Sequence, residues 1–391
     1  MTTNRTAIRR WLQVGGSAHR PPFATRKARH RTIVAPLAAT LAATAAVGIG
    51  VVLARAGGER RSKRLRRRER RLGLSPDERL TAGLRRMAIA QAEMAIEELE
   101  GAEPQNTDRA VHETRKAIKR LRTIVRLLES QLGKDASARE HASLRAAAAV
   151  LADARDAEVM LETLEGLVER HRRSLAGRRG IRRLQAHLSA ERDRTEMLLQ
   201  NPVSRASAAN ELRAFRSRAG AWHLTERPGI GAIDSGLEHI YRQGRRRGRR
   251  AARGKGGRMR TMHQWRKRVK DLRYAAEILE RPTPAKKGSR ARQARAEAKW
   301  MRKLAKRADE LGELLGEEHD LAVFAQWLRD EGKRAGVGRG TRRRLEKVIS
   351  ARRAELRRRA LRDGRRLYRR SPKKFVARVR RASRRTGPKL S

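Results

Sequence analysis

The chain has 391 residues, and its 98 Lys and Arg against 42 Asp and Glu give a formal net charge of +56. A charge this positive exceeds what solubility requires and indicates a polyanionic partner. The sequence contains no Cys, which excludes disulfides, thiolate nucleophiles and Cys-type zinc sites. Its 3% of aromatic residues argue against stacking platforms for single-stranded nucleic acid.

The N-terminal region holds a candidate membrane span. Residues 33–54 carry no charged side chain over 22 positions, which is long enough to cross a bilayer as a helix. A basic tail, 1–32, and a basic linker, 55–75, flank this stretch, so the distribution of positive charge gives no orientation. A single membrane anchor and an N-terminus that does not span therefore both stay open, with an exported signal peptide as a third alternative.

A helical domain is expected to begin at the Ser-Pro-Asp-Glu sequence of 75–78, where Ser at the N-cap, Pro at the first position and acids in the first turn mark a helix start. The sequence that follows is rich in helix formers and shows no alternating strand pattern between hairpin turns, which predicts an all-α fold. Breaks are expected at 101–107, 132–135, 201–202, 227–231, 254–257, 281–284 and 332–340. The expected domain is 76–384, with halves at about 76–226 and 232–384 and a basic tail at 385–391.

An internal repeat relates the two halves. The sequences VHETRKAIKRLRTIVRLLES and MHQWRKRVKDLRYAAEILER begin at Val111 and Met262, 151 residues apart. A second matching pair follows, LADARDAEVMLETL at 151–164 and LGEEHDLAVFAQWL at 315–328. The spacing from His to the matched Asp is 44 residues in one half and 57 in the other. This pattern predicts two helical bundles of common descent, in which the connecting loop has changed length and the flanking helices have not.

The repeated helix is expected to be basic on one side and apolar on the other. At 100° per residue, the repeated His, Arg and Lys positions fall within an arc of about 120°. The arc contains His112, Arg115, Lys116, Lys119 and Arg122 in the first copy and His263, Arg266, Lys267, Lys270 and Arg273 in the second. We expect each helix to bury its apolar side and to present these cations on the other.

The chemistry of this face suits phosphate. Arg offers two parallel N–H donors to phosphate oxygens, Lys supplies a mobile point charge, and a protonated His adds a donor. A lone row of cations is often only a solvated surface, but recurrence at the same offsets indicates a common ligand. Bound polyanion would relieve repulsion among the cations, so the ligand is expected to stabilise the fold.

The repeated sequences, together with YRQGRRRGRR at 241–250 and YRRSPKKFVARV at 368–379, resemble the CHAD family, the conserved histidine α-helical domain, over about 76–380. The resemblance implies two pseudo-symmetric four-helix bundles whose basic helices face a central cavity or groove that binds inorganic polyphosphate. It implies these ligand residues: His112, Arg115, Lys116, Lys119, Arg120, Arg122, His263, Arg266, Lys267, Lys270 and Arg273.

Several further positions depart from the repeated pattern or lie beside it. Asp271 departs from the pattern, because it stands where the first copy has Arg120. Asp156 and Asp320 are expected to pair with Arg or to cap a helix, since a carboxylate would repel the ligand. Five residues before the second copy either extend the strip or form a solvated basic face: Tyr241, Arg242, Arg245, Arg246 and Arg249.

No catalytic, metal or cofactor site is expected. His112-Glu113 resembles the start of a zinc-protease helix, but Lys116 stands where the second His belongs. The sequence therefore indicates a non-catalytic polyphosphate-binding protein of the cytoplasm, associated with polyphosphate granules. The alternatives are a nucleoid-associated protein that binds nucleic acid without specificity and a polyanion scaffold that residues 33–54 anchor at an anionic membrane surface. The oligomeric state stays open.

Overall fold

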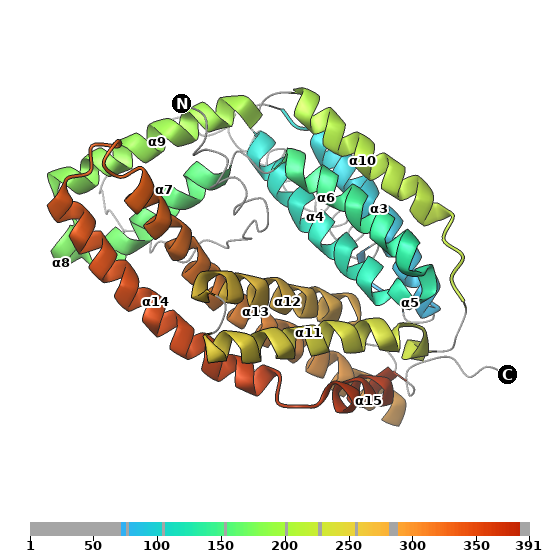
Figure 1. Ribbon diagram of the computed structural model, residues 1–391. Helices are drawn as coiled ribbons and strands as arrows, with labels where there is room; N and C mark the ends of the chain where they lie inside the picture. Colours follow the sequence, from blue (N-terminus) through green and yellow to red (C-terminus); the bar gives the residue numbers. More distant parts are fainter. Residues whose placement is uncertain are drawn as a thin grey trace, which may run out of the picture. The chain divides into compact units, whose positions relative to one another are not determined.

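The computed structural model describes residues 72–75, 78–103, 106–151, 155–199, 202–225, 229–254, 257–280 and 288–383 (Figure 1). The candidate membrane span at 33–54, the N-terminal tail and nearly all of the basic linker lie outside these residues, as does the C-terminal tail. Within the described ranges, no helix combines the length and the apolar character that crossing a bilayer requires.

The described part of the chain is all-α, with thirteen α-helices, one 3₁₀-helix and no strand. The helices of the first half are α3 Leu80–Glu100, α4 Thr107–Leu127, α5 Glu129–Leu132, α6 Lys134–Val150, α7 Arg155–Arg170, α8 Arg172–Leu175, α9 Arg179–Leu199 and α10 Pro202–Gly220. Those of the second half are η2 Gly229–Ile233, α11 Asp234–Arg253, α12 Arg258–Ile278, α13 Ser289–Asp330, α14 Arg339–Leu367 and α15 Pro372–Ser383.

The expected helix start at 75–78 is wrong, because α3 begins at Leu80 after an extended Arg79 with φ −62° and ψ 136°. The Glu78 carboxylate explains the difference. It accepts a hydrogen bond from the Ser75 backbone N–H at 3.1 Å and another from Arg86 Nε at 2.7 Å. Glu78 therefore links Ser75 to Arg86 of α3 and does not extend the helix.

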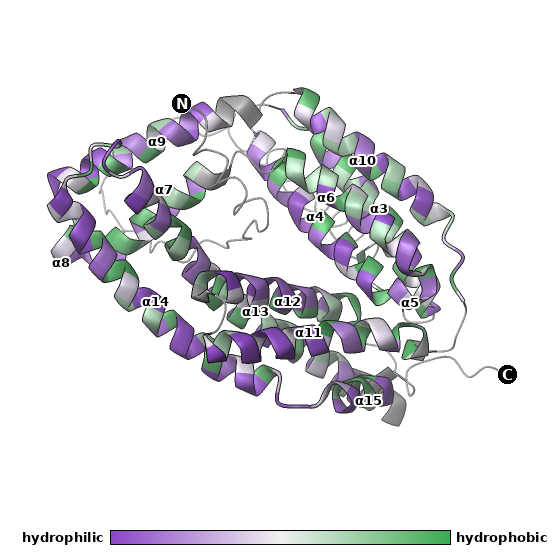
Figure 2. Cartoon of the chain, viewed as in Figure 1, coloured by the Kyte–Doolittle hydropathy of each residue, from purple (hydrophilic) through white to green (hydrophobic). Residues whose placement is uncertain are grey.

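One hydrophobic cluster joins two groups of helices. In the first group, α3, α4, α6 and α10 pack around residues such as Leu84, Leu121 and Leu212. In the second, α11, α12, α15 and the first part of α13 pack around residues such as Trp265 and Phe375. Figure 2 shows hydrophobic residues where these helices face one another, with hydrophilic residues along the visible sides of α11 and α14. Because α4 and α12 contact each other, the repeated helices of the two halves meet.

A separate hydrophobic cluster is built from α7, α9, the last part of α13 and the first part of α14. The second matching elements of the repeat meet here, since Leu164 of α7 and Leu328 of α13 occupy equivalent positions and are both fully buried. Both pairs of repeated elements therefore meet: α4 contacts α12, and α7 contacts α13.

The expectation that the flanking helices keep their length is confirmed for α4 and α12, which both have 21 residues, and is wrong for α7 and α13. In the first half α6 ends at Val150 and α7 begins at Arg155, whereas α13 runs for 42 residues, Ser289–Asp330, through the equivalent stretch. The break lets α6 and α7 pack into different clusters, while α13 serves both. Further helix ends were not expected from the sequence. They lie after Leu127, after Arg170, at Gly177, which has φ +70°, and after Leu367.

Candidate functional site

The contact between α4 and α12 is reciprocal. Arg126, the fourteenth residue after the first repeated His, lies 2.9 Å from Asp271, the eighth residue after the second. Arg120, the eighth residue after the first His, lies 3.6 Å from Glu277, the fourteenth after the second. Such an exchange of positions is what a twofold relation between two helices produces. Both ion pairs join an arginine of the first copy to an acid of the second.

In the first copy, all the expected cations are half-buried: His112, Arg115, Lys116, Lys119, Arg120 and Arg122. Some of them already have partners within the fold. Arg115 donates a hydrogen bond to the Leu151 carbonyl at 2.5 Å, and Lys116 lies 3.5 Å from the Glu113 carboxylate. The first copy is therefore partly accessible and partly tied to neighbouring residues.

In the second copy, two of the expected ligand residues are buried. His263 is 4% exposed and Arg266 is 2% exposed, so the expectation that both copies present all their cations is wrong for these two. The cause is α13, which covers this side of α12. The His263 ring lies 4.1 Å from that of His319, and a Cβ added at Gly316 would lie 3.3 Å from Arg266 Nη2. The remaining three are half-buried: Lys267, Lys270 and Arg273.

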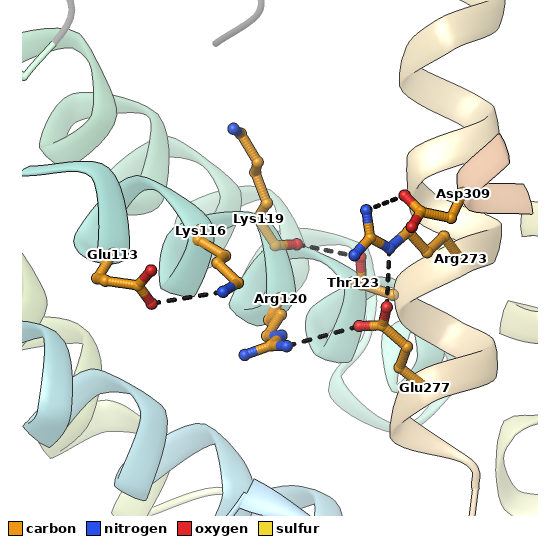
Figure 3. A network of polar contacts seen from close by, with 8 residues as sticks. All are labelled: Glu113, Lys116, Lys119, Arg120, Thr123, Arg273, Glu277 and Asp309. Carbon is orange, nitrogen blue, oxygen red and sulfur yellow. Dashed lines mark hydrogen bonds and ion pairs between the residues drawn. The ribbon is translucent and has the colours of Figure 1, made fainter. Parts of the chain in front are cut away.

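Two arginines from the two copies share one carboxylate (Figure 3). Glu277 lies 2.8 Å from Arg273 and 3.6 Å from Arg120, and Arg273 also pairs with Asp309. Both arginines also lie over the ring of Tyr274, Arg273 at 5.6 Å and Arg120 at 6.0 Å from its centroid. A phosphate that binds Arg120 or Arg273 therefore has to compete with Glu277. The Lys119 ammonium points away from these carboxylates in the view of Figure 3.

A group of basic side chains from α4, α6 and α12 surrounds Asp271, and we refer to it as the Asp271 cluster. Its members are Arg122, Arg126, His141, Arg145, Lys267, Arg268 and Asp271. Asp271 lies 2.9 Å from Arg126 and 3.1 Å from Arg268. Repetition did not point to Arg126, His141, Arg145 or Arg268. Arg126 could nevertheless have been predicted from the sequence, because it lies one turn beyond Arg122 on the basic side of α4.

The crowding of positive charge lowers several pKa values in this cluster. Burial, followed by the charge of Arg126, lowers the pKa of Arg122 to about 10. Burial, with Arg122 and Arg268 nearby, lowers the pKa of Lys267 to about 8. Burial and the same arginine-rich surroundings lower the pKa of His141 to about 3, so its imidazole is neutral at physiological pH.

A second set of buried titratable groups lies between α12 and α13. Burial, together with the charge of Arg266, lowers the pKa of Lys270 to about 7, although Glu313 and Asp320 act in the opposite direction. Burial and the neighbouring His263 hold the pKa of His319 well below its ordinary value. Asp320, for which an Arg partner or a capping role was expected, lies inside α13 and therefore caps no helix, and its charge acts on Lys270. The side chain of Asp156 lies outside the described residues.

The expected extension before the second copy is only partly on the surface. Tyr241 is 1% exposed, donates a hydrogen bond to the Leu367 carbonyl at 3.3 Å and stacks on Phe375 with the ring centroids 4.0 Å apart. It therefore lies in the core and not on a basic strip. Arg245 is half-buried and donates to the Tyr368 carbonyl at 3.3 Å. The other three residues are exposed on α11: Arg242, Arg246 and Arg249.

Comparison with known families gives one result. The family model described as CHAD domain matches residues 90–329, which include both copies of the repeated helix. A comparison with curated proteins finds no match.

Proposed function

The chain belongs to the CHAD domain family, and on that premise we propose that it binds inorganic polyphosphate through the basic residues of α4 and α12. The observation that carries the proposal is the reciprocal contact of these helices. It brings two copies of one cationic motif together, and arginines of the first copy meet acids of the second. We also propose that the two helix groups are pseudo-symmetric bundles whose basic helices face a common groove.

A thin and flexible phosphate chain suits half-buried cations better than a rigid duplex does. Each arginine can offer two parallel donors to phosphate oxygens, and each lysine adds a point charge. The half-buried members of both copies remain within reach of such a chain. Exposed arginines such as Arg249 and Arg250 would add a weaker, salt-sensitive attraction for any polyanion, including DNA.

The proposed role is binding without catalysis. Asp271 and Glu277, the acids at the contact of α4 and α12, are engaged by arginines. No group of three His, Asp or Glu side chains suited to a metal ion occurs within the described ranges. We propose a cytoplasmic location with association to polyphosphate granules; anchoring through residues 33–54 is the competing proposal.

The test removes three half-buried lysines, Lys116→Gln, Lys119→Gln and Lys267→Gln, and compares them with three exposed ones, Lys303→Gln, Lys306→Gln and Lys347→Gln. Both triple variants lose the same charge. Because charge-assisted contacts are among the stronger hydrogen bonds, the first variant should bind long-chain polyphosphate on the order of a hundredfold more weakly. The second should stay within a few-fold of the original chain, and helicity should be unchanged in both.

The binding assay includes competition with duplex DNA at about 150 mM salt. Polyphosphate should displace DNA much more readily than DNA displaces polyphosphate. Equal losses of affinity in the two triple variants, or equally easy displacement in both directions, would contradict the proposal and leave a nonspecific polycation.

A further inference from the structure

The Asp271 cluster brings together positive charge from α4, α6 and α12. At neutral pH it holds four charged arginines and Lys267, and His141 is neutral beside them. Asp271 contacts two of the arginines directly, and Glu129 acts on Arg126 in the same direction. Positive charge therefore exceeds negative charge within a partly buried region, which is unfavourable without an added anion.

The arrangement of the arginines around Asp271 resembles that around a phosphate. Arg126 lies beside Oδ1 at 2.9 Å and Arg268 beside Oδ2 at 3.1 Å, so the two guanidinium groups each engage one oxygen of the same anionic group. Arg122 Nε and His141 Nδ1 are buried and have no hydrogen-bond partner among the described residues. Arg145 is exposed and lies at the solvent side of the cluster. The cluster thus offers an unused donor on Arg122, an unpaired imidazole nitrogen on His141 and an approach from solvent.

We propose that the Asp271 cluster is an anion site for one phosphate group, in which the Asp271 carboxylate occupies the place of the phosphate until the ligand binds. The inference rests on the proposed function and extends it, because the site recruits Arg126, His141, Arg145 and Arg268, which the repeat does not assign. The phosphate belongs either to a long polyphosphate chain or to a short di- or triphosphate, since the recognised chemistry is the same.

This role gives Asp271 two opposite effects. Without ligand, its carboxylate balances Arg126 and Arg268, so its loss leaves partly buried arginines uncompensated and lowers the melting temperature. With ligand, the same carboxylate repels the entering phosphate, so its loss strengthens binding. If Asp271 forms only a structural ion pair, its loss lowers the melting temperature and leaves phosphate binding unchanged. If the site needs Asp271 to hold its arginines in position, its loss weakens phosphate binding.

The experiment uses the full chain with Asp271→Asn and Arg145→Gln. Asp363→Asn is the matched control for the first variant, because Asp363 is also flanked by two arginines, Arg362 at 3.1 Å and Arg366 at 4.0 Å. Arg365→Gln, at an exposed position of α14, is the control for the second. Thermal melts and calorimetric titrations are run with triphosphate and with long-chain polyphosphate at constant ionic strength.

The Asp271→Asn variant should melt at a lower temperature without ligand and bind triphosphate on the order of tenfold more tightly, because one repulsive charge is removed. Arg145→Gln should bind triphosphate several-fold more weakly at an unchanged melting temperature. Both controls should match the original chain. If long-chain polyphosphate shows the same changes, the site also engages the long chain; if only triphosphate does, it engages the short anion.

Weaker or unchanged triphosphate binding by Asp271→Asn would overturn the inference, as would equal behaviour of Arg145→Gln and Arg365→Gln. Either result, combined with tight binding of long-chain polyphosphate by the original chain, would leave the proposed function standing. Failure of the original chain to bind phosphate chains of any length would overturn both.

Discussion

At the scale of single residues, Tyr241 shows how one side chain can serve the core while its neighbours remain on the surface. Its ring stacks on Phe375 of α15, and its hydroxyl reaches the Leu367 carbonyl at the end of α14. Burial raises the pKa of Tyr241, so its phenol is neutral at physiological pH. Tyr241 therefore holds α11 against α14 and α15, while exposed arginines on the other side of α11 meet solvent.

Replacing Tyr241 by Phe should reduce the free energy of unfolding by about 1 kcal/mol, the usual worth of one neutral hydrogen bond. Tyr241→Ala should cost about 3–5 kcal/mol, because it also leaves a cavity beside Phe375. Urea unfolding measures both changes, and polyphosphate affinity should be unaltered in the Phe variant. Loss of affinity with unchanged stability would instead assign the Tyr241 hydroxyl to the ligand site.

The residues of the candidate site could be predicted from the sequence only in part. Helical periodicity assigns His263 and Arg266 to the polar side of their helix, but it does not say which helix covers that side. α13 covers them, and Gly316 leaves room for the Arg266 guanidinium where the first half has Ala152. The repeat predicts Arg122 and Lys267 of the Asp271 cluster, and the basic arc of α4 extends to Arg126. His141 and Arg145 could not be predicted, because they come from α6, which carries neither repeated motif.

At the scale of helices, the repeat predicts which elements correspond but not how long each one is. The matched pairs meet across the molecule, α4 with α12 and α7 with the last part of α13. Glycine and proline mark most of the helix ends correctly. The break between α6 and α7 has no such mark, because it follows from the packing of these two helices into different hydrophobic clusters.

Because the two hydrophobic clusters are separate, we expect the helices of each cluster to unfold with their own free energy. Leu164 is fully buried in the cluster of α7, α9, α13 and α14, so Leu164→Ala should cost about 3 kcal/mol and act mainly there. Hydrogen exchange should become faster in α7, α8 and α9, whereas α3, α4 and α12 keep their protection and polyphosphate affinity is retained. Val203→Ala, at a position 71% exposed, is the control. Uniform loss of protection would show instead that the two clusters unfold as one unit.

At the scale of the whole molecule, the net charge of +56 opposes folding wherever cations are buried. Lys267 and Lys270 have pKa values of about 8 and about 7, against 10.5 for an ordinary lysine, and burial is the main cause for both. Between these lowered pKa values and 10.5, the two lysines hold fewer protons in the folded chain than in the unfolded chain. Their destabilising effect is therefore complete below about pH 7 and is relieved as the pH rises toward 10.5.

Folding favours the neutral form of these two lysines, whereas bound phosphate favours their protonated form. Between about pH 7 and about 9.5, the ligand-free chain should become more stable, while the rise in melting temperature that polyphosphate causes should shrink. Melts with and without polyphosphate across this range measure both trends. Lys267→Gln should weaken the pH dependence of both melting temperatures, because it removes one of the two lysines whose protonation changes. Lys306→Gln, at an exposed site on α13 where the lysine lies 3.9 Å from Glu310, should leave them unchanged. A polyphosphate-induced rise in melting temperature that stays constant across the range would show that neither of these half-buried lysines senses the ligand.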